Sequence, residues 1–122
     1  MPATSIIDHD ARIVRSRAWG ILSDSDLEGT QATLHADPRF DPMYRQVYDF
    51  SGVTEVQVTG EFVRRLARSS LFSPHARRAV VVNSDVAFGL ARMFGLVGDR
   101  DPDSFMIFRD IQSAEDWIDS PE

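Results

Sequence analysis

The chain offers few side chains that could carry out catalysis or hold a metal ion. Its histidines, His9, His35 and His75, lie far apart, and no pair has the spacing of a helical metal site. There is no cysteine, which excludes disulfides, thiolate nucleophiles and cysteine-ligated metals. Glycine-rich phosphate loops and a Gly-x-Ser-x-Gly elbow are also missing, and the acidic residues fit caps, turns and surface charge. We therefore expect no enzyme, no metal and no cofactor.

Arginines form the first group that stands out. Arg64, Arg65, Arg68, Arg77 and Arg78 follow one another with no acidic residue between Arg64 and Arg78. On a chain with a net charge of −6, this segment is a local positive field that suits an acidic partner or a phosphate. The competing and simpler explanation is a solvated helix face.

A second group is Phe88 with Arg92. Both lie on one face of an expected helix, roughly opposite the apolar stripe that contains Leu90 and Phe94. An exposed Phe88 would be an interface anchor. If the helix is covered on two sides, Phe88 is only part of the core.

The elements that must position these residues alternate between strands and helices. The first part of the chain predicts a hairpin and one helix with a capping box made by Ser25 and Glu28. The middle predicts a strand, a turn at Ser51-Gly52, a short extended segment and a helix that begins at Gly60 with Thr59 as its N-cap. In order, the expected elements are strands over 5–8 and 12–19, a helix over 26–36, strands over 44–50 and 53–58, and a helix over 60–70.

The last part of the chain continues the alternation. A strand over 78–83 contains an unbroken apolar run, which is typical of a strand covered on both faces. We expect the next helix to begin after Ser84 and to end at Gly98. A strand over 105–108 and a terminal helix that opens at Ser113 complete the chain. Strands that alternate with helices in this way predict a largely parallel or mixed sheet with helical cover.

Length and composition indicate the class of protein. At 122 residues the chain is long enough for one domain over 1–122, and its 43% hydrophobic residues fit a globular fold. The negative net charge argues against nucleic-acid binding, which needs a surplus of cations. Because no apolar run reaches the length of a bilayer span and no secretory signal is recognisable, we expect no membrane insertion and a cytoplasmic location.

The segment Val47-Tyr48-Asp49-Phe50-Ser51-Gly52-Val53-Thr54 resembles the strand and turn of STAS domains, the bacterial anti-sigma factor antagonists of SpoIIAA type. In that family the pattern continues as Asp-Ser-Ser-Gly, with a phosphorylatable serine before the glycine. Here those positions are Gln57-Val58-Thr59-Gly60, so a hydroxyl and the glycine match while the Asp and the first Ser do not. The resemblance implies a phospho-acceptor at Thr59, where helix N–H groups stabilise a phosphate. A plain N-cap is the simpler explanation.

Nearly the whole chain is similar to small bacterial SpoIIAA-like (STAS/CRAL-TRIO-like) proteins of uncertain role. The similarity lies in the loop 37–40, the helix segment 87–93, and the segments 108–110 and 114–118. It implies a mixed four- to five-stranded sheet with helices mostly packed on one face. Such a likeness indicates a fold more than a function.

Two functions are consistent with these observations. The first is a non-enzymatic interaction module whose partner, a protein of unknown identity or a second copy of the chain, meets Thr59, Gly60, Ser51 and a patch of Arg64, Arg65, Arg68, Phe88 and Arg92. The alternative is a small carrier of an apolar or lipid-like ligand bound between sheet and helices. An internal cavity lined by apolar side chains would favour the carrier, and a solid core with an exposed Phe88 or Thr59 would favour the interaction module.

Overall fold

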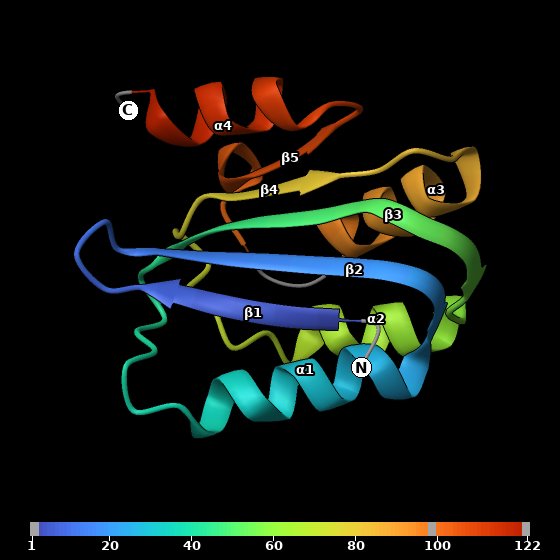
Figure 1. Ribbon diagram of the computed structural model, residues 1–122, viewed down its shortest axis with the longest axis horizontal. Coiled ribbons are helices and arrows are strands. Elements are labelled where there is room, and N and C mark those ends of the chain that lie inside the picture. The colour runs from blue at the N-terminus through green and yellow to red at the C-terminus, as the bar shows by residue number, and fades with distance from the viewer. Residues whose placement is uncertain (1–2, 98–99, 121–122) are drawn as a thin grey trace.

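The computed structural model describes residues 3–97 and 100–120, which form a mixed five-stranded β-sheet between helices (Figure 1). The elements are β1 (Ala3–Asp8), β2 (Ile13–Ser23), α1 (Asp24–Ala36), β3 (Arg45–Gln57), α2 (Gly60–Arg68), β4 (Arg78–Val81), α3 (Asp85–Leu96), the 3₁₀ turn η1 (Pro102–Ser104), β5 (Phe105–Phe108) and α4 (Ile111–Asp119). The predicted α/β class and the alternation of strands with helices are confirmed.

The strands lie in the sheet in the order in which they follow in the chain. β1 and β2 form the predicted antiparallel hairpin, and the other three neighbouring pairs are parallel. One helix joins the two strands of each parallel pair. Because such crossovers are right-handed and all three step in the same direction, α1, α2 and α3 lie on one face of the sheet. The last helix, α4, follows β5 and covers the opposite face (Figure 1).

Alternation along the strands divides the core between the two faces. Val47, Ala79 and Val81 are buried against Ala114 and Ile118 of α4. Their neighbours Tyr48, Val80 and Val82 point to the other face, toward the three crossover helices. The apolar run in β4 is therefore covered on both faces, as its sequence predicts.

Exposed and buried side chains alternate along the second strand. Arg15, Arg17 and Trp19 are exposed, whereas Ser16 and Ala18 between them are buried. Arg15 pairs with Glu115 of α4 at 2.7 Å, and the guanidinium of Arg17 lies over the ring of Trp19 at 5.1 Å. The strand is longer than expected, because it continues to Ser23 without a break.

The predicted turn at Ser51-Gly52 is wrong, because β3 runs through it as one strand of 13 residues. In the register with β2, Arg17 pairs with Asp49 and Trp19 pairs with Gly52, so β3 carries one extra residue there. Such an insertion is a β-bulge. A Cβ at Gly52 would lie 3.1 Å from Cβ of Trp19, so the glycine permits a close approach of the two strands.

The predicted capping box at the start of α1 is also wrong. The helix begins at Asp24, and the carboxylate of Asp26 accepts hydrogen bonds from N and Oγ of Ser23, both at 2.9 Å. Ser25 and Glu28 therefore lie inside the helix and not at its start. The chemistry of the cap is as expected, a serine followed three residues later by an acid, but it occurs two residues earlier.

The ends of the last two helices also differ from the prediction. The final helix begins at Ile111, because the carboxylate of Asp110 accepts from N of Ser113 at 2.8 Å and so caps it three residues earlier than expected. Helix α3 ends at Leu96. The stop predicted at Gly98 lies outside the described residues.

Candidate functional site

The structure places Thr59 at the start of α2, as predicted. Its Oγ1 accepts from N of Phe62 at 3.1 Å, which makes it the N-cap of the helix. The same hydroxyl donates to Oδ2 of Asp24 at 3.0 Å, and N of Thr59 donates to Oδ1 of that carboxylate at 2.9 Å. Asp24 thus ties the start of α1 to the start of α2.

This contact bears on the proposed phospho-acceptor. A phosphate on Thr59 would bring about two negative charges next to the Asp24 carboxylate and would remove the hydroxyl proton that Asp24 accepts. The helix dipole favours a phosphate at this end, while the carboxylate disfavours it. The geometry therefore fits a structural cap directly, and a phosphorylated Thr59 only with a rearrangement of Asp24.

Ser51 and Gly60 do not form one site. Ser51 lies inside β3, where its N donates to Oδ1 of Asp49 at 2.9 Å and its carbonyl accepts from Nδ2 of Asn83 at 2.7 Å. About 20 Å of strand, at about 3.3 Å per residue, lies between Ser51 and the end of β3. Gly60 follows that end as the first residue of α2.

The predicted arginine patch is exposed on α2 and α3, which pack against each other. The side chains of Arg64, Arg65 and Arg68 lie on the solvent side of α2, and Arg92 lies on that of α3. Phe88 is half-buried, and the guanidinium of Arg109 lies over its ring at 4.7 Å. Phe88 is therefore partly covered by the chain itself.

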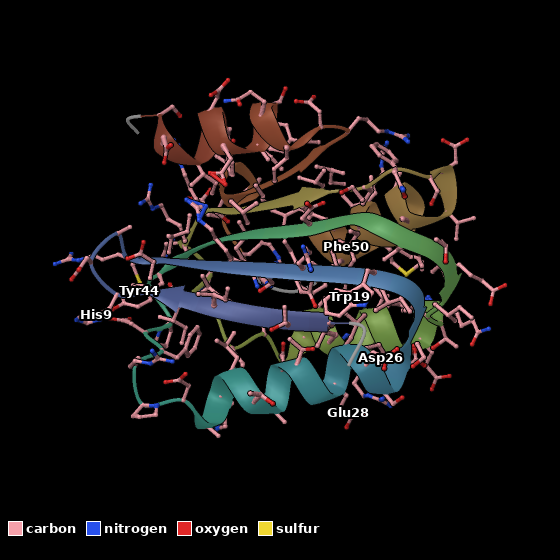
Figure 2. All side chains as sticks on the ribbon, in the orientation of Figure 1. His9, Trp19, Asp26, Glu28, Tyr44 and Phe50 are labelled. Carbon is pink, nitrogen blue, oxygen red and sulfur yellow. The ribbon has the colours of Figure 1, made fainter. Side chains whose placement is uncertain are left out.

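The histidines remain separate in space. Figure 2 shows His9 beside Tyr44 at one end of the sheet, where Nδ1 of the histidine and Oη of the tyrosine are 2.5 Å apart. His35 is exposed near the end of α1, and His75 is exposed in the loop before β4. In the described part of the chain, no group of three or more histidine, aspartate or glutamate side chains is arranged to hold a metal ion.

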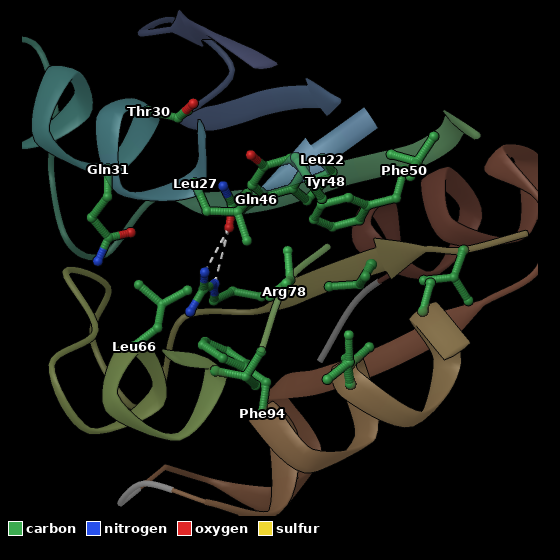
Figure 3. A pocket seen from close by; sticks show the side chains of 18 of the residues that line it. Leu22, Leu27, Thr30, Gln31, Gln46, Tyr48, Phe50, Leu66, Arg78 and Phe94 are labelled. Atoms are coloured by element: carbon green, nitrogen blue, oxygen red, sulfur yellow. Dashed lines mark hydrogen bonds between the residues drawn. The ribbon is translucent and has the colours of Figure 1, made fainter. Parts of the chain in front are cut away.

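The most apolar hollow is a partly open cavity of about 120 Å³ between the sheet and the three crossover helices (Figure 3). Its walls are almost entirely apolar. Helix α1 contributes Leu27 and Leu34, and α3 contributes Leu90 and Phe94. The remaining apolar wall comes from α2, from the preceding loops and from the sheet; its members include Leu22, Phe50, Val53, Val56, Val63, Leu66, Phe72, Val80, Val82 and Phe105.

The cavity lies where α2 stands away from the sheet. Helix α2 lies close to α3 and makes few close contacts with the strands, whereas α4 on the other face lies directly on β3, β4 and β5. Helix α3 is apolar along most of its length, yet none of its residues is fully buried.

A charged side chain enters this apolar space. Arg78 at the start of β4 places its guanidinium between the sheet and the helices (Figure 3). Its Nε and Nη2 donate to Oε1 of Gln46 at 3.0 and 2.9 Å, and its Nη1 donates to Oγ of Ser70 at 3.1 Å. Gln46 in turn donates from Nε2 to Oγ of Ser16 at 2.9 Å. A polar chain therefore crosses the sheet beneath the cavity.

Aromatic rings and a second arginine surround the guanidinium of Arg78. It lies 4.3 Å from the ring centroid of Phe72 and 5.1 Å from that of Phe94. Burial, and then repulsion from Arg100, lower the pKa of Arg78 to about 9. The group stays protonated at neutral pH, so a positive charge remains in apolar surroundings.

Tyr48 is the second polar group at the cavity. Its ring stacks on that of Phe50 at 4.2 Å, and its Oη is buried without a hydrogen-bond partner in the described residues. The hydroxyl of Thr30 beside it donates to the carbonyl of Asp26 at 2.9 Å. Burial, the largest effect, raises the pKa of Tyr48 to about 12, so the phenol is neutral over the physiological range.

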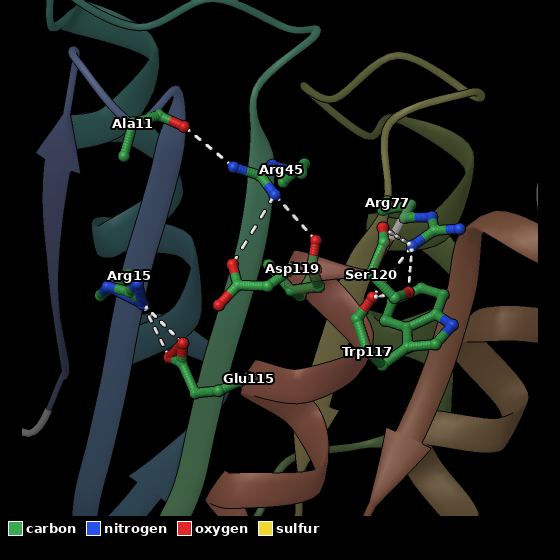
Figure 4. Close-up of polar contacts among 9 residues, drawn as sticks. Ala11, Arg15, Arg45, Arg77, Glu115, Trp117, Asp119 and Ser120 are labelled. Atoms are coloured by element: carbon green, nitrogen blue, oxygen red, sulfur yellow. Dashed lines mark hydrogen bonds and ion pairs between the residues drawn. The ribbon is translucent and has the colours of Figure 1, made fainter. Parts of the chain in front are cut away.

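The predicted arginine cluster is divided between the two faces of the sheet, as Arg77 next to Arg78 shows. Its Nη1 donates to the carbonyls of Trp117 and Ser120 at 2.9 and 3.1 Å, at the end of α4 (Figure 4). Arg45 donates from Nη1 to the carbonyl of Ile118 at 2.7 Å. Cations at a helix C-terminus satisfy its free carbonyls. Arg77 and Arg45 therefore hold α4 on one face, while Arg78 enters the cavity on the other.

Comparison with known proteins gives no match to a family model, to a curated protein or to a solved structure. Over the described residues, no helix has the length and apolar character needed to cross a lipid bilayer. The cavity and the polar groups that enter it are thus the features from which a function can be argued.

Proposed function

We propose that this protein binds a small, mainly apolar molecule in the cavity between the sheet and helices α1, α2 and α3. The observation that carries the proposal is a partly open, mainly apolar cavity of about 120 Å³ between the sheet and the helices. An engineered apolar cavity of about 150 Å³ stays dry and takes up benzene or xenon, which sets the scale of the ligand. A single aromatic ring or a short branched hydrocarbon group fits this scale better than a long acyl chain.

Binding without catalysis is the simplest role for such a site. The ionisable groups at the cavity wall are Arg78, with a pKa of about 9, and Tyr48, with a pKa of about 12. General acid–base catalysis at neutral pH needs a group that titrates near 7. We therefore propose a carrier or sensor of a small molecule, and not an enzyme.

The SpoIIAA-like fold is also a proposal. It is supported by the order of the elements, by the mixed sheet and by the position of three helices on one face. The interaction module with a switch at Thr59 stays a prediction, since Thr59 already caps α2 and contacts Asp24.

Denaturation in the presence of a neutral ligand tests the proposed function. A ligand that binds only the folded state stabilises it by about 2.7 kcal/mol at a concentration of 100 times its Kd. We expect toluene to raise the midpoint of urea unfolding of the wild-type protein. Toluene should not shift the midpoint of an Ala91→Leu variant, in which a cavity-lining residue is enlarged. No rise for toluene or for other single-ring hydrocarbons would contradict the proposal.

A further inference from the structure

The polar end of the cavity has a charge without a counter-charge. Among the described residues, Arg78 forms no ion pair with a carboxylate, and its partners Gln46 and Ser70 are neutral. Most charged side chains that leave water are paired, because an unpaired charge in apolar surroundings is costly. Within the described residues, the charge of Arg78 is therefore stabilised only by neutral hydrogen-bond acceptors and aromatic rings.

A second arginine increases the positive field at this place. Arg100 lies over the ring of Phe94 at 4.3 Å, on a ring that Arg78 also contacts. Its Nη2 makes only long hydrogen bonds of 3.4 Å to the carbonyls of Ala67 and Val97, and its Nε is buried without a partner in the described part of the chain. Two partly buried guanidinium groups therefore lie near one aromatic ring, and no carboxylate of residues 3–97 or 100–120 is paired with either.

The guanidinium of Arg78 retains hydrogen-bonding capacity. An arginine has five N–H donors, and three of those of Arg78 are used on Gln46 and Ser70, which leaves two. Two N–H groups of one guanidinium can bind the two oxygens of a carboxylate in parallel. The remaining wall is apolar and suits the hydrocarbon part of such a ligand.

We propose that the cavity takes a small carboxylate, with an aromatic or branched aliphatic body between the helices and its carboxyl oxygens on the free N–H groups of Arg78. This inference rests on the proposed function and names the chemical class of the ligand. Arg78 is then the residue that selects an anion over a neutral molecule of the same shape. Gln46 and Ser70 are positioning residues that hold the guanidinium at the cavity.

Benzoate and nitrobenzene test this selection, because they have nearly the same shape and differ in charge. We expect calorimetry to give a Kd for benzoate about tenfold or more below that for nitrobenzene with the wild-type protein, as expected for hydrogen bonds to a charged group. Equal affinities, or tighter binding of nitrobenzene, would overturn the proposal of a carboxylate and leave the proposed function intact. If neither compound binds, the proposed function fails as well.

Two variants test whether the preference for benzoate arises at Arg78 in the cavity. In Arg78→Gln the preference for benzoate should disappear while nitrobenzene still binds, and a preference that survives would show that Arg78 does not select the ligand. In Ala91→Leu both compounds should lose affinity. Benzoate that still binds Ala91→Leu would be held by exposed arginines such as Arg64 and Arg68, which would overturn the assignment to the cavity. If Arg78→Gln does not fold, the comparison of the two compounds on the wild-type protein and on Ala91→Leu still decides the question.

Discussion

Replacing Ala91 by leucine should make the protein more stable and remove its ligand site. Ala91 lines the cavity from α3 and is half-buried. A leucine adds three carbon atoms, each worth about 0.8 kcal/mol when buried. After the loss of side-chain freedom, we expect the free energy of unfolding to rise by about 1–2 kcal/mol.

Urea denaturation measures this change, and a toluene titration measures the loss of binding. Arg92→Leu is the matched control, because it adds a leucine to the next, exposed position of the same helix. We expect the control to leave the free energy of unfolding within about 0.5 kcal/mol of wild type and to bind toluene normally. A destabilised Ala91→Leu protein would refute the reasoning, since it would mean that this part of the interior is already filled.

Other substitutions test separate parts of the structure. Tyr48→Phe removes a buried hydroxyl without a partner, and urea denaturation should show a gain of about 1 kcal/mol; a loss would mean that the hydroxyl is bonded. Because burial raises the pKa of Tyr48 to about 12 while an unfolded tyrosine titrates near 10, the unfolded state loses its proton first. Wild type should therefore lose more stability than Tyr48→Phe as the pH rises from about 10 to 12. Gly95→Ala should destabilise by about 1–3 kcal/mol, since its Cβ would lie 2.7 Å from the ring of Phe105. Gly89→Ala on the same helix meets open space and should stabilise by about 0.5–1 kcal/mol, and equal effects at both glycines would contradict this packing. Thr59→Glu should destabilise the protein by about 1 kcal/mol and so lower its melting temperature. The substitution removes the cap hydrogen bond and places a second carboxylate beside that of Asp24. An unchanged or higher melting temperature would favour the phosphorylation switch.

Local sequence signals predicted most of the elements. The apolar run of β4, the alternation in β2 and the cap at Thr59 each depend on neighbours in the chain, and each is present in the structure. The prediction of a turn at Ser51-Gly52 is wrong because a glycine that permits close strand packing has the same local sequence pattern as one that permits a turn. Only the register against β2 distinguishes the two.

The cavity could not be predicted, because it depends on the distance between helices and sheet. Residues such as Leu90 and Phe94 have the pattern of a filled core, and the pattern is the same whether or not the core is closed. In the sequence, Arg78 belongs to the same run of arginines as those of α2, although strand alternation places it on the same face as Val80 and Val82. That alternation was the one signal in the sequence that could have placed its charge inside.

The proposed ligand site is the space between the sheet and the crossover helices. Nuclear Overhauser effects between dissolved toluene and assigned methyl groups of the protein test it most directly. We expect cross-peaks to the methyl groups of Val80, Val82 and Leu90, which line the cavity, and none to those of the exposed Val86 on the outer side of α3. Cross-peaks only to exposed methyl groups such as those of Val86, or no cross-peaks with toluene near saturation, would contradict the account.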